Sequence, residues 1–211
     1  MIPSFPIYLF DVDGTLVDSA PDICGAIQDT LLRAGRKDVS DQFLRSYIGR
    51  HLLDLFRDLF PERDDDYVAA LISDYRSIYP ARNHCGTQLY PGVLETFRSL
   101  GGRKSTATTK GTPTTKIVLE KFGLASYFDH IQGTDGFPAK PNPDVIFAAL
   151  KGLGAEPQDC LFVGDSTCDM EAARCAGVRA CAVTYGYGER HQLAEWEPDF
   201  WISDLRELLS D

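Results

Sequence analysis

The sequence predicts an α/β fold in which a doubly wound parallel sheet is interrupted, after its first strand, by an inserted α-helical cap domain. Three observations lead to this prediction. A short apolar run over residues 7–10 is typical of a parallel strand that is buried on both faces. Apolar residues at helical spacing then continue from residue 20 to about residue 82, with no strand pattern among them. From residue 90 onward, helix and strand patterns alternate, which indicates a parallel sheet with crossover helices.

The helical segment is expected to form a domain of its own. Turn-forming residues at 35–38 and 61–66 divide it into helices. We therefore predict a helical cap domain over residues 17–85, called the cap below. The α/β core domain then comprises residues 1–16 and 86–211.

The second part of the core domain is predicted as helices and strands in alternation. The expected helices cover residues 93–100, 113–122, 143–153, 169–176 and 204–209. The expected strands cover residues 105–109, 130–132, 160–163, 180–183 and 200–202. With the strand at residues 7–10, these strands would complete the parallel sheet.

The composition excludes several classes of function. Among 211 residues, 31 acidic and 21 basic side chains give a formal net charge of −10, which would repel a nucleic-acid backbone. No stretch is long and apolar enough to cross a membrane, and no signal segment opens the chain, so we expect a cytoplasmic protein with no membrane partner. The six cysteines contain no CxxC pair, so we interpret them as reduced packing residues.

Polar residues follow four of the predicted strands. In chain order they are Asp11, Asp13, Thr108, Thr109, Lys110, Lys140, Asp165 and Asp169. Ligands bind at the carboxyl ends of parallel strands, so we expect these side chains to converge on one edge of the sheet. Each motif alone has a structural alternative, such as a turn or a helix cap provided by Ser166 or Asp169. Their shared position after the strands favours catalysis.

The residue types in this group suit the chemistry of a phosphate ester. Clustered carboxylates repel one another unless a cation neutralises them, and oxygen ligands of this kind suit Mg²⁺. Lys140 and the Thr108 hydroxyl can bind an anionic group such as phosphate. An aspartate beside the metal can attack phosphorus, and a second aspartate can transfer the proton. Gly14 allows a tight turn that brings backbone amides toward the phosphate.

Four segments in this order resemble the motifs of the haloacid dehalogenase superfamily of phosphohydrolases, in the subgroup whose helical cap follows the first motif. The segments are DVDGTLVDS, TTK, AKPNP and VGDSTCD. Three further stretches resemble the phosphoglycolate phosphatase branch of that superfamily: YPGVLETF at 90–97, AARCAGVRACAV at 172–183 and VTYGYG at 183–188. The resemblance extends over essentially the whole chain.

The resemblance implies a role for each matching acidic residue. Asp11 would be the nucleophile and Asp13 the general acid and base. Mg²⁺ would be held by the Asp11 carboxylate, the Asp13 backbone carbonyl and Asp165, with Asp169 supporting the site. Hydrolysis of a phosphate ester is implied, because the dehalogenases of the superfamily lack the second aspartate.

The resemblance also implies a phosphate-binding group made of Thr108, Thr109 and Lys140. Thr109 stands where the family often has asparagine. The strand before it, KSTATT, is rich in threonine where the family usually has aliphatic residues, so we expect looser packing there. The loop that precedes Lys140, QGTDGFPAK, is short.

The cap is expected to select the substrate. Within SYIGRHLLDLF at 46–56, Gly49 could let the chain bend toward the site, and Arg50 could pair with a substrate carboxylate, as in 2-phosphoglycolate. The alternative is that Arg50 and His51 belong to a solvated helix face.

The expected function is Mg²⁺-dependent hydrolysis of a small phosphorylated metabolite by a monomer or homodimer, with 2-phosphoglycolate as the favoured substrate. One alternative is a phosphatase of the same kind for another sugar phosphate, a nucleoside monophosphate or pyrophosphate. Another is a non-catalytic phosphate-binding or signalling module.

Overall fold

The computed structural model describes residues 2–209 and contains a parallel sheet of five strands. In spatial order the strands are β4 (Arg103–Thr106), β1 (Ile7–Phe10), β5 (Cys160–Gly164), β6 (Arg179–Val183) and β7 (Phe200–Ile202). The chain leaves β1 toward β4 on one side and later returns to pair β5 on the other side. The direction of winding therefore reverses at β1, where open α/β sheets bind ligands.

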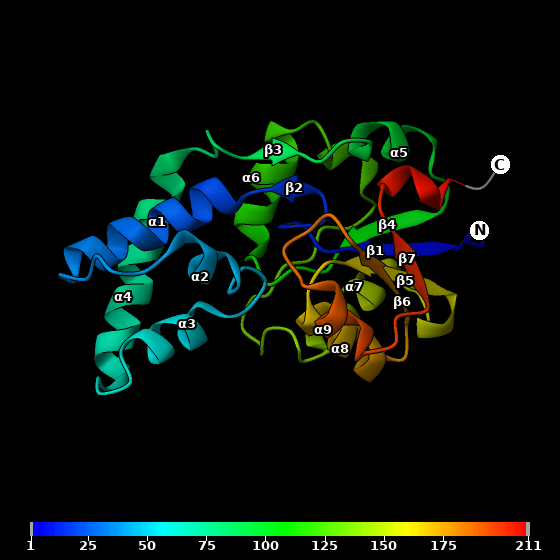
Figure 1. The fold of residues 1–211 in the computed structure, drawn as a ribbon. Helices are drawn as coiled ribbons and strands as arrows, with labels where there is room; N and C mark the ends of the chain where they lie inside the picture. Colours follow the sequence, from blue (N-terminus) through cyan, green and yellow to red (C-terminus); the bar gives the residue numbers. More distant parts are fainter. Residues whose placement is uncertain (1, 210–211) are drawn as a thin grey trace.

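Two hydrophobic layers cover the sheet because successive side chains of a strand face opposite sides. Tyr8 and Phe10 face the layer formed with α5 (Val93–Ser99) and the 3₁₀ helix η4 (Leu205–Leu208). Ile7 and Leu9 face the opposite layer. That layer contains α7 (Asp144–Leu153), α8 (Thr167–Ala176) and α9 (Arg190–Ala194). Figure 1 shows α5 above the sheet and these three helices below it.

The cap helices lie beyond the carboxyl ends of the strands (Figure 1). They are α1 (Ala20–Arg33), α2 (Asp41–Arg45), α3 (Leu52–Leu59) and α4 (Asp65–Ile78), followed by the 3₁₀ helix η1 (Tyr79–Arg82). Their buried apolar residues form a separate cluster that includes Ile27, Phe56 and Leu71. The side chains of Ser40 and Asp64 cap α2 and α4, as is usual for serine and aspartate at these positions.

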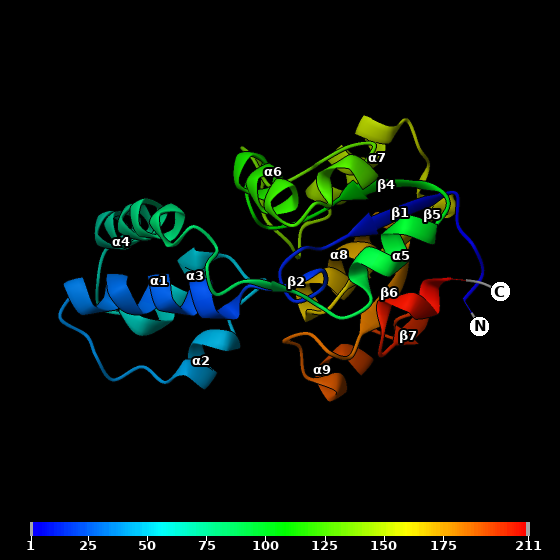
Figure 2. The same cartoon turned by 90° about the horizontal axis from the view of Figure 1, so that it is seen from above.

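Two short antiparallel strands connect the cap to the core. They are β2 (Val17–Asp18) and β3 (Gln88–Leu89), and Figure 2 shows β2 between the cap helices and the sheet. The sequence pattern did not predict them, because two residues are too few to show an alternation. The proposed boundaries of the cap, residues 17–85, stay a prediction.

The segment at residues 130–132 was wrongly predicted as a strand of the sheet. It makes a single isolated bridge, which pairs His130 with Ser105, and a second isolated bridge follows it between Gly133 and Thr108. The Thr106 hydroxyl accepts a hydrogen bond from the Gln132 backbone at 2.8 Å and donates one to the Gln132 carbonyl at 2.9 Å. A side chain therefore occupies the place of a regular ladder.

Other predicted boundaries differ from the structure by smaller amounts. Strand β4 begins and ends earlier than the predicted 105–109, and the helix predicted at 204–209 is the 3₁₀ helix η4. The remaining elements are α6 (Thr112–Lys121), η2 (Ala125–Tyr127) and η3 (Pro157–Asp159). Within residues 2–209, no helix has the length and apolar character needed to cross a membrane.

Candidate active site

The carboxyl ends of β1 and β5 bring three aspartates into one buried cluster. Asp11 directly follows β1, Asp165 directly follows β5, and Asp169 lies in the first turn of α8. One oxygen from each carboxylate lies within 4.8 Å of the others. The predicted convergence of these residues is confirmed, and their oxygens form a set that could hold a metal ion.

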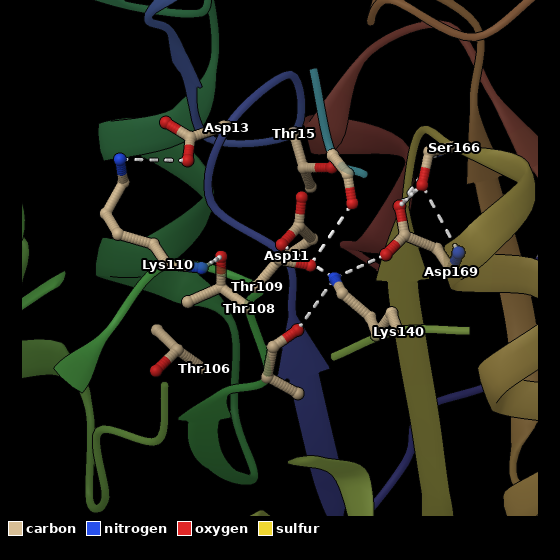
Figure 3. A network of polar contacts seen from close by, with 12 residues as sticks. Asp11, Asp13, Thr15, Thr106, Thr108, Thr109, Lys110, Lys140, Ser166 and Asp169 are labelled. Carbon is tan, nitrogen blue, oxygen red and sulfur yellow. Dashed lines mark hydrogen bonds and ion pairs between the residues drawn. The ribbon is translucent and has the colours of Figure 1, made fainter. Parts of the chain in front are cut away.

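Lys140 reaches the same cluster from the loop before α7 (Figure 3). Its Nζ atom lies 2.8 Å from Asp11 Oδ1 and 2.5 Å from Asp169 Oδ1, and it donates to the Ala107 carbonyl at 3.0 Å. Burial lowers the pKa of the Lys140 ammonium, but the two carboxylates more than offset this effect, so its pKa is raised. Lys140 is therefore a buried, charged group beside Asp11.

The cluster carries more negative charge than Lys140 can neutralise. Burial raises the pKa of Asp11 to about 6, against the opposing effect of Lys140. Burial also raises the pKa of Asp165 well above its usual value, and repulsion from Asp169 and Asp11 adds to the shift. These shifts show that the site disfavours three ionised carboxylates in the absence of a further cation. The buried carboxylate oxygens fit a hard divalent cation.

Asp169 has little freedom to move, because both of its oxygens are already used. Its Oδ2 atom accepts hydrogen bonds from the Asp165 and Ser166 backbones at 3.1 and 2.9 Å and from the Ser166 hydroxyl at 2.7 Å. The Ser166 hydroxyl in turn accepts from the Asp169 backbone, which completes a capping box at the start of α8. Asp169 thus caps a helix and also holds Lys140.

Two loops surround the Asp165 carboxylate, one after β1 that contains Gly14 and Thr15, and one after β6 that contains Tyr187. Thr15 donates to Asp165 Oδ1 at 3.0 Å, and the Tyr187 backbone donates to Oδ2 at 2.8 Å. Gly14 has a positive φ of 87°, and a Cβ atom there would lie 2.2 Å from Asp165 Oδ2. This position therefore requires glycine for its backbone conformation and for its close approach to the carboxylate.

The Asp13 side chain points away from the carboxylates of Asp11 and Asp169 (Figure 3). Its Oδ2 atom forms an ion pair with Lys110 Nζ at 3.1 Å, and its Oδ1 atom accepts from the Ser19 hydroxyl at 2.5 Å. Lys110 Nζ also donates to the Tyr79 hydroxyl of the cap at 3.0 Å. The sequence pattern places Lys110 among the residues expected at this edge of the sheet but does not assign it a part in catalysis or phosphate binding. Its position two residues after Thr108, at the end of a strand, was the available signal.

Thr108 and Thr109 lie next to each other in the structure but have different partners. Thr108 is buried, and its hydroxyl accepts from the Lys110 backbone at 3.4 Å. The Thr109 hydroxyl donates to the Gly49 carbonyl at 3.2 Å, which links the core to the cap.

A cavity of about 640 Å³ lies between the cap and the core. The core side of the wall includes Asp11, Asp13 and Thr108. The cap side is largely apolar, with Ile23, Ile27, Ile48, Leu52, Leu55, Ile72, Tyr75 and Tyr79. A molecule in the cavity would therefore meet Asp11 and Asp13 at one end and the cap at the other.

Gly49 and Arg50 lie in the loop between α2 and α3 and also line the cavity. Gly49 has a positive φ of 91° and approaches Ser166 of the core. The Arg50 side chain is exposed, and its guanidinium carbon lies 5.3 Å from the centre of the Tyr47 ring. The placement of Arg50 at the cavity agrees with the expected position, and its contact with a substrate stays a prediction.

The chain is similar to several known proteins in sequence and in structure. The "Phosphoglycolate phosphatase 1" of Pseudomonas aeruginosa is 37% identical to the chain over 96% of this chain and 78% of that protein. The "Phosphoglycolate phosphatase" of Vibrio vulnificus is 33% identical over 95% of this chain and 92% of that protein. The solved structure of a haloacid dehalogenase-like family hydrolase from Streptococcus pneumoniae is 28% identical, with a TM-score of 0.89 over 98% of both chains.

A family model described as "Haloacid dehalogenase-like hydrolase" matches residues 8–183. This span includes the cap, the aspartate cluster, Lys140 and the strands that position them. The chain belongs to the haloacid dehalogenase-like hydrolase family.

Proposed function

We propose that this protein is a Mg²⁺-dependent phosphomonoester hydrolase that acts through an aspartyl phosphate on Asp11, with 2-phosphoglycolate as its substrate. The observation that carries the proposal is the buried convergence of Asp11, Asp165, Asp169 and Lys140 beside a cavity covered by the cap. Relatives named phosphoglycolate phosphatase support the choice of substrate. The proposal also keeps the expectation of a cytoplasmic monomer or homodimer.

Asp11 and Asp13 would share the covalent chemistry. In the first step, an Asp11 carboxylate oxygen attacks phosphorus and the bond from phosphorus to the leaving oxygen breaks, while Asp13 donates its proton to that oxygen. Glycolate leaves with this proton. In the second step, Asp13 takes a proton from a water molecule whose oxygen attacks phosphorus, and the bond to Asp11 breaks to release inorganic phosphate.

The metal would be held by the Asp11 carboxylate, the Asp13 backbone carbonyl and Asp165. Asp169 would support this group, since its oxygens hold Lys140 and the start of α8. When bound, Mg²⁺ supplies positive charge that offsets the repulsion among the carboxylates and attracts the phosphoryl oxygens.

Lys140, Thr108 and Thr109 would bind the phosphoryl group. Lys140 Nζ lies 2.8 Å from the oxygen of the proposed nucleophile, so it is close to any phosphorus that Asp11 attacks. A buried ammonium and a hydroxyl bind developing negative charge more strongly than the same groups would in water. Gly49 and Arg50 would contribute to substrate selection from the cap.

A phosphate-release assay over a panel of small esters tests the proposal. The panel contains 2-phosphoglycolate, a sugar phosphate, a nucleoside monophosphate and pyrophosphate, each with Mg²⁺ and with EDTA. We expect the highest kcat/KM for 2-phosphoglycolate and loss of turnover with EDTA. A higher kcat/KM for another ester would keep the chemistry and change the substrate. No release from any ester would support a non-catalytic phosphate-binding protein.

A further inference from the structure

We infer that Lys110 is a substrate-binding residue whose ammonium group binds the carboxylate of 2-phosphoglycolate. The inference rests on the proposed function and deepens it. It assigns the recognition of the leaving group to a lysine of the core, next to Asp13.

Lys110 differs from the other basic residues of the cavity wall in its burial. Within residues 2–209, three lysine or arginine side chains line the cavity: Arg50, Arg76 and Lys110. Arg50 and Arg76 are exposed, whereas the Lys110 side chain is 8% exposed. An exposed cation gains little from an ion pair, because water and salt screen it. A nearly buried cation therefore contributes more to the binding of an anionic ligand.

The geometry of the substrate places its carboxylate near Lys110. Asp13 must come within hydrogen-bond distance of the leaving oxygen in order to protonate it. In 2-phosphoglycolate a single methylene group separates this oxygen from the carboxylate, so the two groups are only about 3 Å apart. Lys110 Nζ lies 3.1 Å from Asp13 Oδ2. The proton donor for the leaving oxygen and a cation for the attached carboxylate are thus adjacent.

Lys110 is charged and retains a donor for a ligand. Its Nζ atom forms an ion pair with Asp13 Oδ2 at 3.1 Å, which is the contact of an ammonium group with a carboxylate. An ammonium group has three N–H donors. Asp13 and Tyr79 are its side-chain partners within the described part of the chain, which leaves one N–H for a molecule in the cavity that Lys110 lines.

Tyr79 brings the cap into contact with Lys110. It belongs to η1 of the cap, and its hydroxyl accepts from Lys110 at 3.0 Å. Its ring centre lies 4.7 Å from Lys110 Nζ. The cap therefore helps to orient a cation of the core toward the end of the substrate that lies away from the phosphate.

Binding of two matched ligands to a protein without turnover tests the inference. Isothermal titration calorimetry in the presence of Mg²⁺ compares 2-phosphoglycolate with ethyl phosphate, in which a methyl group replaces the carboxylate. Both ligands are titrated into Asp11→Asn and into Asp11→Asn combined with Lys110→Met. We expect the preference for 2-phosphoglycolate, the ratio of the two Kd values, to fall by about 10-fold or more with Lys110→Met, as for a lost charge-assisted hydrogen bond.

Three further variants in the Asp11→Asn background define the controls, and a fourth is held in reserve. Lys116→Met removes the same charge from the exposed face of α6 and should leave the ratio unchanged. Lys110→Arg keeps the charge and should restore part of the preference. Arg50→Met tests the cap arginine directly. Lys110→Gln replaces the methionine variant if the latter unfolds at a much lower temperature than the parent protein.

Several outcomes would overturn the inference. One is an equal loss of affinity for both ligands in Lys110→Met, which would mean that Lys110 acts only through Asp13. Another is a loss of preference in Arg50→Met but not in Lys110→Met, and a third is the absence of any preference in Asp11→Asn. Turnover by the protein with Asp11 intact tests the proposed function separately, so the two failures are distinguishable.

Discussion

Asp11 and Asp13 are separated by one residue, yet their carboxylates have different partners. Asp11 contacts Lys140 within the buried aspartate cluster, whereas Asp13 contacts Lys110 and Ser19 at the cavity. A nucleophile must be held against phosphorus, and a proton donor must face the leaving oxygen. The two sets of contacts therefore match the two roles that we propose.

Replacement of Asp13 by asparagine tests the second role. Asp13→Asn keeps a polar side chain of the same shape but cannot donate or take the proton. We expect steady-state phosphate release to slow by about 10²- to 10⁴-fold, as is typical for loss of a general acid and base. Acid quenching and peptide mass spectrometry should find the phosphoryl group on the peptide that contains Asp11. An unchanged rate would remove Asp13 from this role.

Replacement of Gly14 by alanine tests how closely the loop after β1 packs against Asp165. Gly14→Ala should lower the unfolding temperature and weaken stabilisation by Mg²⁺, because the new Cβ atom would lie 2.2 Å from Asp165 Oδ2. Gly35→Ala is the matched control, since Gly35 has a similar φ of 80° and a Cβ atom there would have no neighbouring atom within 4 Å. Differential scanning fluorimetry with and without Mg²⁺ measures both effects. Equal behaviour of the two variants would contradict the steric argument.

At the scale of elements, a tyrosine of the core caps the first helix of the cap. The Ser19 side chain makes no capping hydrogen bond at the start of α1. Instead, the Tyr187 hydroxyl accepts from the Ser19 and Ala20 backbones at 2.8 and 3.0 Å and donates to Asp18 at 2.9 Å. The N–H groups at a helix start need such partners, so the core stabilises the entry into the cap.

Removal of this hydroxyl should destabilise the protein. Tyr187→Phe leaves the Ser19 N–H without its partner and the Ala20 N–H with only the Asp18 carboxylate at 3.3 Å, and we expect a loss of about 1–3 kcal/mol in the free energy of unfolding. Urea unfolding measures the loss. Tyr67→Phe is the control, because the Tyr67 hydroxyl makes no hydrogen bond with residues 2–209. A loss no larger than that of the control would show that Tyr187 does not cap α1.

His84 lies in the segment between η1 and β3. Its burial should make the stability of the folded protein depend on pH. Burial lowers the pKa of His84 from its usual 6.5, and the charge of Lys110 adds to the effect. The unfolded chain therefore binds a proton more readily than the folded protein, so this contribution to stability is lost as the pH falls below 6.5. His84→Asn, which tolerates the φ of 50° at this position, should show a smaller drop in unfolding temperature between about pH 7.5 and about pH 5.5. An equal drop in both proteins would contradict this account.

The elements that the sequence predicted well are those with a strong apolar pattern. The strands at residues 7–10 and 200–202 have the predicted bounds, and the helix predicted at 93–100 ends one residue earlier. The errors lie where polar side chains replace backbone pairing, as Thr106 does opposite Gln132. Periodicity cannot reveal such a substitution, because it depends on which segment lies beside the strand.

The sequence predicted one part of the candidate site and missed another. The convergence of Asp11, Lys140 and Asp165 follows from the rule that ligands bind at the carboxyl ends of parallel strands. The contact between Lys110 and Tyr79 does not follow from that rule, because it depends on how the cap docks on the core. Local sequence patterns carry no information about that docking.

At the scale of the whole molecule, the cavity lies between parts that are held together by three separate hydrophobic clusters. The cap has its own buried cluster, and the sheet has one on each face. Polar contacts such as Thr109 to Gly49 and Lys110 to Tyr79 join the two parts around the cavity. The core therefore supplies the groups that we propose to react, and the cap closes the space in which a substrate would lie.

The most direct test of the central claim is phosphate release from 2-phosphoglycolate by the unmodified protein and by Asp11→Asn, each with Mg²⁺ and with EDTA. We predict that only the unmodified protein with Mg²⁺ is active and that Asp11→Asn loses about 10³-fold or more in kcat while it keeps the circular dichroism spectrum of the folded protein. Phosphate release by Asp11→Asn at close to the unmodified rate, with the same dependence on Mg²⁺, would contradict the assignment of Asp11 as the nucleophile.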